Sequence, residues 1–190
     1  MDHPHLSTAE TPPPAYDPVL GGVLGFTHPD LLANHAGRMT DAQRVGLRQG
    51  SPRLVREDVL MAGGFGLFFL IGLIAILPGG ALVPCVGGTV ILGLLTALAA
   101  GLAVRKWIAI RSDVDDGAVM ALEGPARHRA VGGMVGRYGA VYQLVIQETR
   151  FELPKDTLSI FREDATYRIY YAPRSKIILS AEPLQAKRGV

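Results

Sequence analysis

The residues of this sequence with the best potential for chemistry are polar groups near the start of its carboxy-terminal third. Asp113, Asp115 and Asp116 resemble the beginning of a calcium-binding loop, but the other ligands of that loop and its closing Glu are missing. His128 stands between two arginines, with no Cys or Asp at the spacing of a metal site. The candidates for a catalytic site are three polar side chains scattered along the chain: Glu123, His128 again, and Tyr170.

The sequence contains no nucleophile elbow, no phosphate-binding loop motif and no dinucleotide-binding fingerprint. The glycine-rich run VGGMVGRYG, residues 131–139, lacks the Lys-Ser/Thr pair of a phosphate loop and is typical of a long hairpin turn. The single cysteine, Cys85, has no His or Lys beside it and is typical of a small packing residue. We therefore expect a protein that is not an enzyme and that binds no metal and no cofactor.

The elements that must position any site are dominated by one apolar stretch. From Val59 to Val104 the chain contains no Asp, Glu, Lys, Arg or His. Each half of the stretch is about 20 residues long, which is the length an apolar helix needs to cross a bilayer core of ~30 Å. Prolines and glycines, which break helices, lie at its middle, between residues 78 and 84. The pattern predicts a two-helix transmembrane hairpin over residues 58–104.

Basic residues flank this hairpin on both sides, whereas the turn between its helices has none. Arg53 and Arg56 precede the first helix, and Arg105 and Lys106 follow the second, with Trp107 next to them as an expected interfacial anchor. Because positively charged flanks stay inside, we expect a two-pass protein of the bacterial inner membrane with both termini cytoplasmic. Lipid is therefore an expected partner. The formal net charge of +2 is too small to suggest nucleic acid as one.

Small side chains recur at four-residue spacing in both predicted helices. The positions are Ala62 and Gly66 in the first, and Thr89, Gly93, Ala97 and Gly101 in the second. Such stripes allow helix backbones to approach closely in a membrane. Two interpretations remain open: the helices of the hairpin pack on each other through the stripes, or the stripes bind another membrane protein.

The amino-terminal region divides into two parts. Residues 1–26 are proline-rich and lack an apolar period, so we expect disorder; Pro13-Pro14-Ala15-Tyr16 matches a short pattern that WW domains bind. Residues 27–57 predict two short amphipathic helices near the membrane. The first begins at Thr27 with a capping-box pattern, and the second begins near Thr40 and is interrupted by Pro52.

Residues 105–190 predict a cytosolic β-domain, because apolar residues there recur with period two. Strands are expected on either side of Gly124-Pro125, over residues 142–153, and in a hairpin over residues 167–179. Between them, Leu158 and Phe161 would face inward from a short helix. The expected fold class is an α+β membrane protein with a transmembrane α-helical hairpin followed by a small β-barrel or sandwich, OB-like or SH3-like.

Several segments carry a resemblance to known proteins: LLANHAGRMTDAQRVGLR before the hairpin, and EGPARHR, FELP and YRIYYAPRSKIILSAEPL after it. Through these segments the chain resembles bacterial membrane proteins that join a short cytoplasmic arm, a two-helix hairpin and a compact β-domain. The resemblance covers residues 27–184 and implies this layout, but it implies no activity.

These features together predict a non-catalytic accessory subunit of a larger membrane protein complex. Its hairpin would pack against other membrane subunits, and its β-domain and amino-terminal arm would lie on the cytoplasmic face. The alternative is a membrane-anchored binding or regulatory module whose β-domain recognises a cytosolic protein or ligand.

Overall fold

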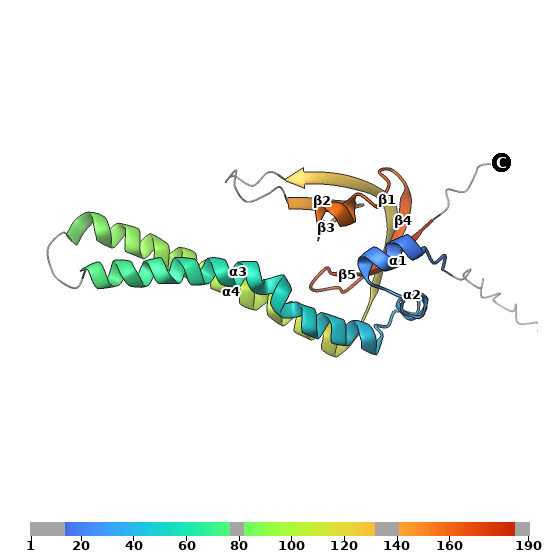
Figure 1. The fold of residues 1–190 in the computed structure, drawn as a ribbon, viewed down its shortest axis with the longest axis horizontal. Coiled ribbons are helices and arrows are strands. Elements are labelled where there is room, and N and C mark those ends of the chain that lie inside the picture. Colours follow the sequence, from blue (N-terminus) through green and yellow to red (C-terminus); the bar gives the residue numbers. More distant parts are fainter. Residues whose placement is uncertain (1–13, 77–81, 132–140, 185–190) are drawn as a thin grey trace, which may run out of the picture. The chain divides into compact units, whose positions relative to one another are not determined.

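A computed structural model describes residues 14–76, 82–131 and 141–184 of the chain. The chain divides into two compact units (Figure 1). The sheet unit contains the described residues of Met1–Arg38, Val119–Tyr171 and Ile177–Val190. The helical unit contains those of Met39–Ala118 together with the short segment Ala172–Lys176.

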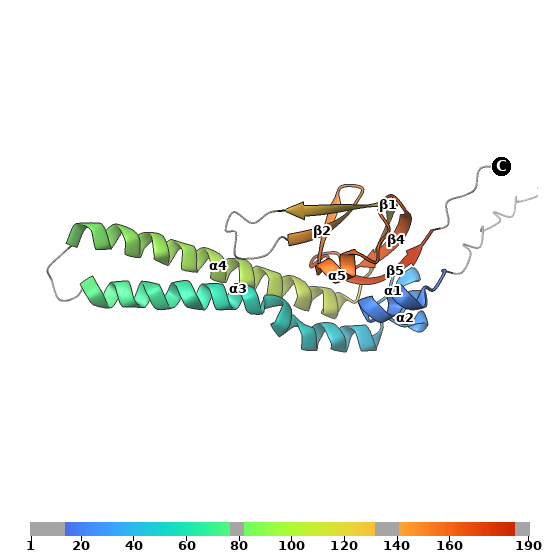
Figure 2. The ribbon, with the colours of Figure 1, turned by 45° about the horizontal axis from the view of Figure 1, so that its top comes forward.

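The helical unit is built on two long helices, α3 (Asp41–Ile76) and α4 (Leu82–Asp116). They run side by side in opposite directions and pack along their length (Figures 1 and 2). Gln43 and Thr40 form reciprocal side-chain-to-backbone hydrogen bonds that cap the start of α3. Gly117, with φ of +62°, ends α4 in the left-handed conformation that glycine adopts without strain.

Both helices extend beyond the boundaries that the sequence predicts. The expected second short helix of residues 27–57 is the beginning of α3, which continues through Pro52 instead of ending there. A proline inside a helix removes one hydrogen bond and bends the helix, and α3 is bent in its first half (Figure 2). Likewise, residues 105–116, expected in the β-domain, are the last turns of α4.

Among the described residues, one helical segment is long and apolar enough to cross a membrane, Val90–Asp116 in α4. Almost none of its apolar part is buried, whereas the core helix of a soluble protein would be mostly buried. The expected turn of the hairpin falls on residues 77–81, outside the described residues.

The sheet unit contains five antiparallel strands in the order β3-β2-β1-β4-β5. Their bounds are β1 Met120–Val131, β2 Val141–Ile146, β3 Thr149–Leu153, β4 Thr166–Tyr171 and β5 Ile178–Pro183. β1 is one continuous strand, and Gly124-Pro125 is where it changes partner: Met120–Pro125 pairs with β4 and Ala126–Val131 with β2. Over the described ranges the sheet is not closed, because β3 and β5 do not pair.

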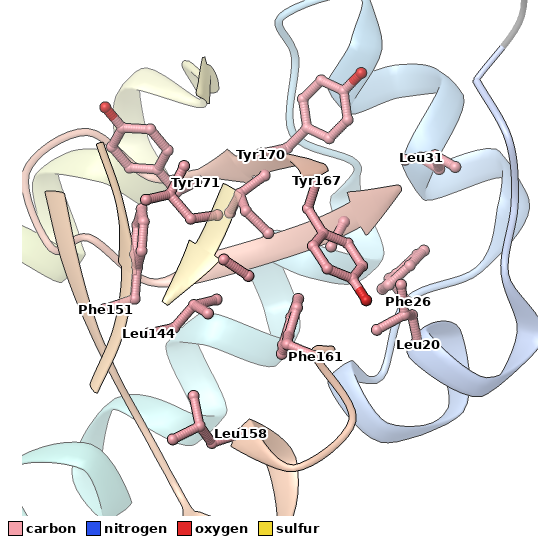
Figure 3. Close-up of a cluster of buried hydrophobic side chains, with 14 residues drawn as sticks. Leu20, Phe26, Leu31, Leu144, Phe151, Leu158, Phe161, Tyr167, Tyr170 and Tyr171 are labelled. Atoms are coloured by element: carbon pink, nitrogen blue, oxygen red, sulfur yellow. The ribbon is translucent and has the colours of Figure 1, made fainter. Parts of the chain in front are cut away.

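Two short helices of the amino-terminal arm, α1 (Pro18–Leu24) and α2 (His28–His35), pack on β5. Disorder was expected for residues 1–26, and this expectation is wrong for the described residues 14–26. Leu20 and Phe26 are buried in the same apolar cluster as the strand residues (Figure 3). Because this cluster removes their side chains from water, ordering the arm is favourable despite its prolines and glycines. Residues 1–13 lie outside the described residues.

The rest of the sheet unit follows the sequence pattern more closely. The short helix α5 (Lys155–Leu158) buries Leu158, and Phe161 just after it is also buried, as expected. β4 and β5 form the expected hairpin, with Lys176 in a left-handed conformation in the connection. The glycine-rich run of residues 131–139 falls, except for its first residue, outside the described part of the chain.

Candidate functional site

The two helices of the helical unit approach each other closely at two glycines. A Cβ atom placed on Gly93 would lie 2.8 Å from Cε2 of Phe69 on α3, closer than real Cβ contacts allow. A Cβ atom on Gly66 would lie 3.6 Å from Cγ2 of Thr96 on α4. Gly66 and Gly93 therefore face the opposite helix, as one of the two interpretations of the small-residue stripes predicts.

Ala97 and Gly101 are placed differently, because both are exposed on α4. A Cβ atom on Gly101 would meet no described atom within 4 Å. A step of four residues turns about 40° beyond one full turn of an α-helix, so a strict four-residue stripe moves away from the contact with α3 after one or two steps. The side chains of the other two stripe residues, Ala62 and Thr89, are outside the described set.

Burial along α4 instead follows alternating steps of four and three residues. Leu92, Thr96 and Ala99 are half-buried there, and Ala103 and Ile110 are buried. This spacing keeps one face of a 3.6-residue helix directed at a neighbour. This spacing is present in the sequence. The prediction used the glycines and the four-residue repeat instead, and it therefore named a different set of positions.

Large apolar side chains remain exposed on both helices after they pack, and we call this surface the apolar belt. Its members are Leu60, Leu67, Phe68, Leu70 and Ile71 on α3, and Val90, Ile91, Leu94, Leu95, Leu98, Leu102 and Val104 on α4. Water-soluble proteins rarely expose a continuous apolar surface of this extent, and such surfaces mark contacts with protein or membrane. Ala97 and Gly101 form a strip of small side chains within this belt.

The basic end of α4 follows directly after the apolar belt. Arg105, Lys106 and Trp107, which the sequence predicts at a membrane interface, are all exposed. The Arg111 guanidinium lies over the Trp107 ring, with its carbon 5.3 Å from the ring centre. Arg111 was not predicted as a partner of Trp107, although their four-residue spacing places them on one helix face. The side chains of Arg53 and Arg56 on α3 are not among those described.

The three aspartates that resemble part of a calcium loop do not converge on one point. Asp113, only 1% exposed, accepts hydrogen bonds from the backbone N–H groups of Arg174 and Ser175. Asp116 pairs with the Arg174 guanidinium at 2.6 Å. Asp115 pairs with Arg48 at 3.2 Å. Their carboxylates thus hold the segment Ala172–Lys176 and α3 within the helical unit.

In the sheet unit, the charged centre is Glu182, which is only 2% exposed. Its carboxylate accepts hydrogen bonds from the Tyr170 hydroxyl at 2.8 Å, from Arg168 Nη1 at 2.9 Å and from the backbone N–H of Ala15 at 2.9 Å. Arg168 also donates through Nε to the half-exposed Glu123. We call these four side chains the Glu182 network. Because its groups satisfy one another, the network is typical of a structural ion cluster.

The structure joins two of the three scattered polar candidates and separates the third. Glu123 and Tyr170 are linked through Arg168 and Glu182. His128 takes no part in the network, and its buried Nε2 has no hydrogen-bond partner among the described residues. The arrangement therefore offers no pairing of a nucleophile with a base in the part of the chain described.

Burial raises the pKa of Tyr170 above its ordinary value of about 10, and the hydrogen bond to Glu182 raises it further. The folded state therefore keeps this proton at a pH where the unfolded state has lost it. We expect the free energy of unfolding to fall as pH rises above about 10, by up to about 1.4 kcal/mol per pH unit from this group. Tyr170→Phe should remove this contribution to the slope of the unfolding free energy against pH.

Urea unfolding of the full chain in detergent micelles between pH 9 and 11, followed by tyrosine near-UV circular dichroism, measures this slope. Tyr142→Phe is the matched control, because this half-buried residue lies beside Lys155 and outside the Glu182 network. It should keep the slope of the natural chain. An unchanged slope in Tyr170→Phe would contradict the prediction.

A shallow pocket of about 390 Å³ lies within the sheet unit. It is lined by the start of α1, by residues 160–167 and by the end of β5, and its polar groups include Asp17, Arg162 and the Tyr167 side chain. Apolar side chains such as Leu20 and Ile160 form much of the rest. The pocket could accept a small or extended ligand of mixed polarity.

Comparison with protein-family models, with curated proteins and with solved structures found no match to this chain. The resemblance to bacterial two-helix membrane proteins therefore stays a prediction. The most distinctive surface among the described residues is the apolar belt, together with the basic end of α4 that follows it.

Proposed function

We propose that the chain is a non-catalytic accessory subunit of a larger membrane protein complex. One observation carries the proposal: the apolar part of α4 stays almost entirely exposed when α4 has packed on α3. An isolated soluble protein would be penalised for leaving this surface in water. A bilayer and a neighbouring membrane subunit together would cover it.

The second span and the orientation of the chain belong to the same proposal. α3 carries its own exposed apolar residues from Leu60 to Ile71, alongside those of α4. If both helices span the membrane antiparallel to each other, the start of α3 and the end of α4 lie on the same side of the membrane. The basic residues at those ends, Arg105 and Lys106 among them, support a cytoplasmic location for that side, in the bacterial inner membrane that the proposal assumes.

The strip formed by Ala97 and Gly101 supports a protein neighbour in addition to lipid. Lipid chains cover leucine and glycine surfaces about equally well, whereas a neighbouring helix gains close backbone contact only at small residues. Leu94 and Leu98, both exposed, lie along one side of the strip and would pack beside an incoming helix. Since Gly101 faces away from α3, the contact would be with another chain.

The test is a Gly101→Leu substitution in the full chain, purified from its native membrane in mild detergent. We expect the natural chain to elute as a discrete large assembly of fixed stoichiometry, and Gly101→Leu to elute without its partners. Ala100→Leu is the matched control, because it places the same side chain at an exposed position turned by about 100° around the helix. It should keep the assembly.

A third variant separates loss of the partner from damage to the helix pair. Gly93→Leu drives a side chain against Phe69 and should push α3 and α4 apart. Gly101→Leu has open space among the described atoms and should keep the helical content and thermal stability of the natural chain. A natural chain that elutes as a monomer or small homo-oligomer would disprove the accessory-subunit proposal.

The pocket in the sheet unit favours a second candidate function, a membrane-anchored module that binds a cytosolic protein or ligand there. Size analysis discriminates the two, since this module needs no fixed membrane assembly. Ala165→Phe, which adds a ring to the pocket lining, should weaken binding of the cytosolic ligand. The full chain must be used, because the arm supplies Leu20 and Asp17 to the pocket wall.

A further inference from the structure

The last turns of α4 combine an apolar surface with a cation on one helix face. Val104, Trp107, Ile108 and Arg111 follow the i, i+3, i+4, i+7 spacing that places side chains in line. All four are exposed. Val104 belongs to the apolar belt, so the face runs from the belt, through the indole ring, to the guanidinium of Arg111.

The guanidinium of Arg111 is positioned by an aromatic ring instead of by an acid. It stacks over Trp107 at 5.3 Å, which leaves the N–H groups at its edge free to donate. The two exposed acids in the following turn are already paired, Asp115 with Arg48 and Asp116 with Arg174. No carboxylate with a described side chain forms an ion pair with Arg111.

A second cation strengthens the positive potential at this end of α4. Arg105 is exposed about 9 Å along the helix axis from Arg111, at 1.5 Å per residue. Two exposed arginines at this end of α4, one of them stacked on an indole next to an apolar surface, suit a ligand with an anionic head and an apolar tail. Arginine also matches the geometry of a phosphate better than lysine does, because its N–H groups form a planar fork.

We propose that this face of α4 binds the headgroup phosphate of an anionic phospholipid. Arg111 donates to the phosphate, Trp107 lies at the headgroup level, and the acyl chains run along Val104 and Ile108 toward the apolar belt. Arg105 adds attraction for the negative headgroup. The inference rests on the membrane location in the proposed function, and it adds a preference for one class of lipid.

Trp107 is the only tryptophan in the chain, so its fluorescence reports on this site alone. The full chain is reconstituted into two sets of vesicles with the same mixture of phosphatidylcholine and phosphatidylglycerol. In one set a fixed fraction of the phosphatidylglycerol carries bromine on the acyl carbons nearest the headgroup, at the depth proposed for Trp107; in the other set the same molar amount of phosphatidylcholine does. Bromine quenches tryptophan on contact, so the ratio of the two quenching values measures local enrichment of the anionic lipid.

We expect brominated phosphatidylglycerol to quench Trp107 several-fold more than brominated phosphatidylcholine, and high salt to reduce the ratio. Arg111→Gln should bring the ratio close to one, whereas Arg111→Lys should keep part of the preference through its charge. Arg150→Gln is the matched control, because Arg150 is an exposed arginine of β3 in the sheet unit. It should leave the ratio unchanged.

Each other outcome overturns a defined part of the argument. Equal quenching by the two lipids would overturn the anionic preference but leave the membrane location intact. A preference that persists in Arg111→Gln would remove Arg111 from the site. Quenching by neither lipid would place Trp107 away from the membrane and overturn both this inference and the proposed location.

Discussion

Replacing Leu31 with alanine is expected to destabilise the sheet unit by about 3 kcal/mol, the typical cost of emptying a fully buried leucine site. Leu31 is 0% exposed and belongs to the apolar cluster that also contains residues of the strands (Figure 3). The cavity would open between α2 and the sheet, so the strands should lose stability although the mutation lies in the arm. Amide hydrogen exchange in β4 and β5 of the full chain, measured by mass spectrometry, should become about a hundredfold faster.

The neighbouring residue supplies the control for this experiment. Leu32 is the same residue type on the same helix but is 44% exposed. Leu32→Ala should change exchange in the strands very little, because an exposed leucine gains little from folding. If Leu31→Ala and Leu32→Ala had equal effects, α2 would not be part of the core of the sheet unit.

The role of the arm could not be predicted from its local sequence. α1 is short and contains Pro18, Gly21 and Gly22, so its intrinsic helix propensity is low. Its stability comes from contacts with β5, which is more than 150 residues away in sequence. Gly21 is required at its position because a Cβ atom there would lie 2.9 Å from the backbone oxygen of Phe26.

The sequence does contain signals for the ends of α1. Asp17 accepts hydrogen bonds from two backbone N–H groups as the N-cap, proline occupies the first helical position, and Gly25 ends the helix with φ of +75°. Proline just inside the start and glycine just past the end are the usual asymmetry of a helix. The prediction of disorder was made from the proline-rich composition of the segment. Composition averages over many residues, whereas helix caps depend on single positions, so it did not indicate this helix.

The apolar character of the long helices could be predicted, but their lengths could not. Hydropathy marks where a helix can be buried in lipid, and it changes sharply at Val59 and Val104. The backbone hydrogen bonds continue past both points, because charged residues such as those around Arg48 and Arg111 are good helix formers in water. The boundaries are set by the caps at Thr40 and Gly117.

Strand positions followed from the alternation of residues, whereas the arrangement of the strands did not. Alternation fixes which face of a strand is buried, as for Leu144 and Ile146 on β2. Whether a sheet closes depends on pairing between strands far apart in sequence, here β3 and β5. The expected barrel or sandwich therefore remains a prediction, and the described strands establish only an antiparallel sheet that is not closed.

The Glu182 network also depends on distant segments, because Ala15 from the arm and residues of β4 meet one carboxylate of β5. Removing a buried partner leaves the other charge without compensation, which typically costs 3–5 kcal/mol. Arg168 is partly reached by water, so we expect the lower value, about 3 kcal/mol, for Glu182→Ala. This loss of stability in Glu182→Ala should make amide hydrogen exchange faster in β4, in β5 and at Ala15.

Glu123 provides an internal comparison, since it pairs with the same arginine from a half-exposed position. Surface ion pairs contribute about 0–1 kcal/mol, so Glu123→Ala should cost less than 1 kcal/mol in the same exchange measurement. The double variant Arg168→Met with Glu182→Met should recover much of the stability lost in Glu182→Ala, because it buries no unpaired charge. If Glu123→Ala proved as damaging as Glu182→Ala, the stability of the network would not depend on burial of its carboxylates. If the double variant recovered nothing, the cost of Glu182→Ala would lie in lost packing and in the freed Ala15 N–H instead of in an uncompensated charge.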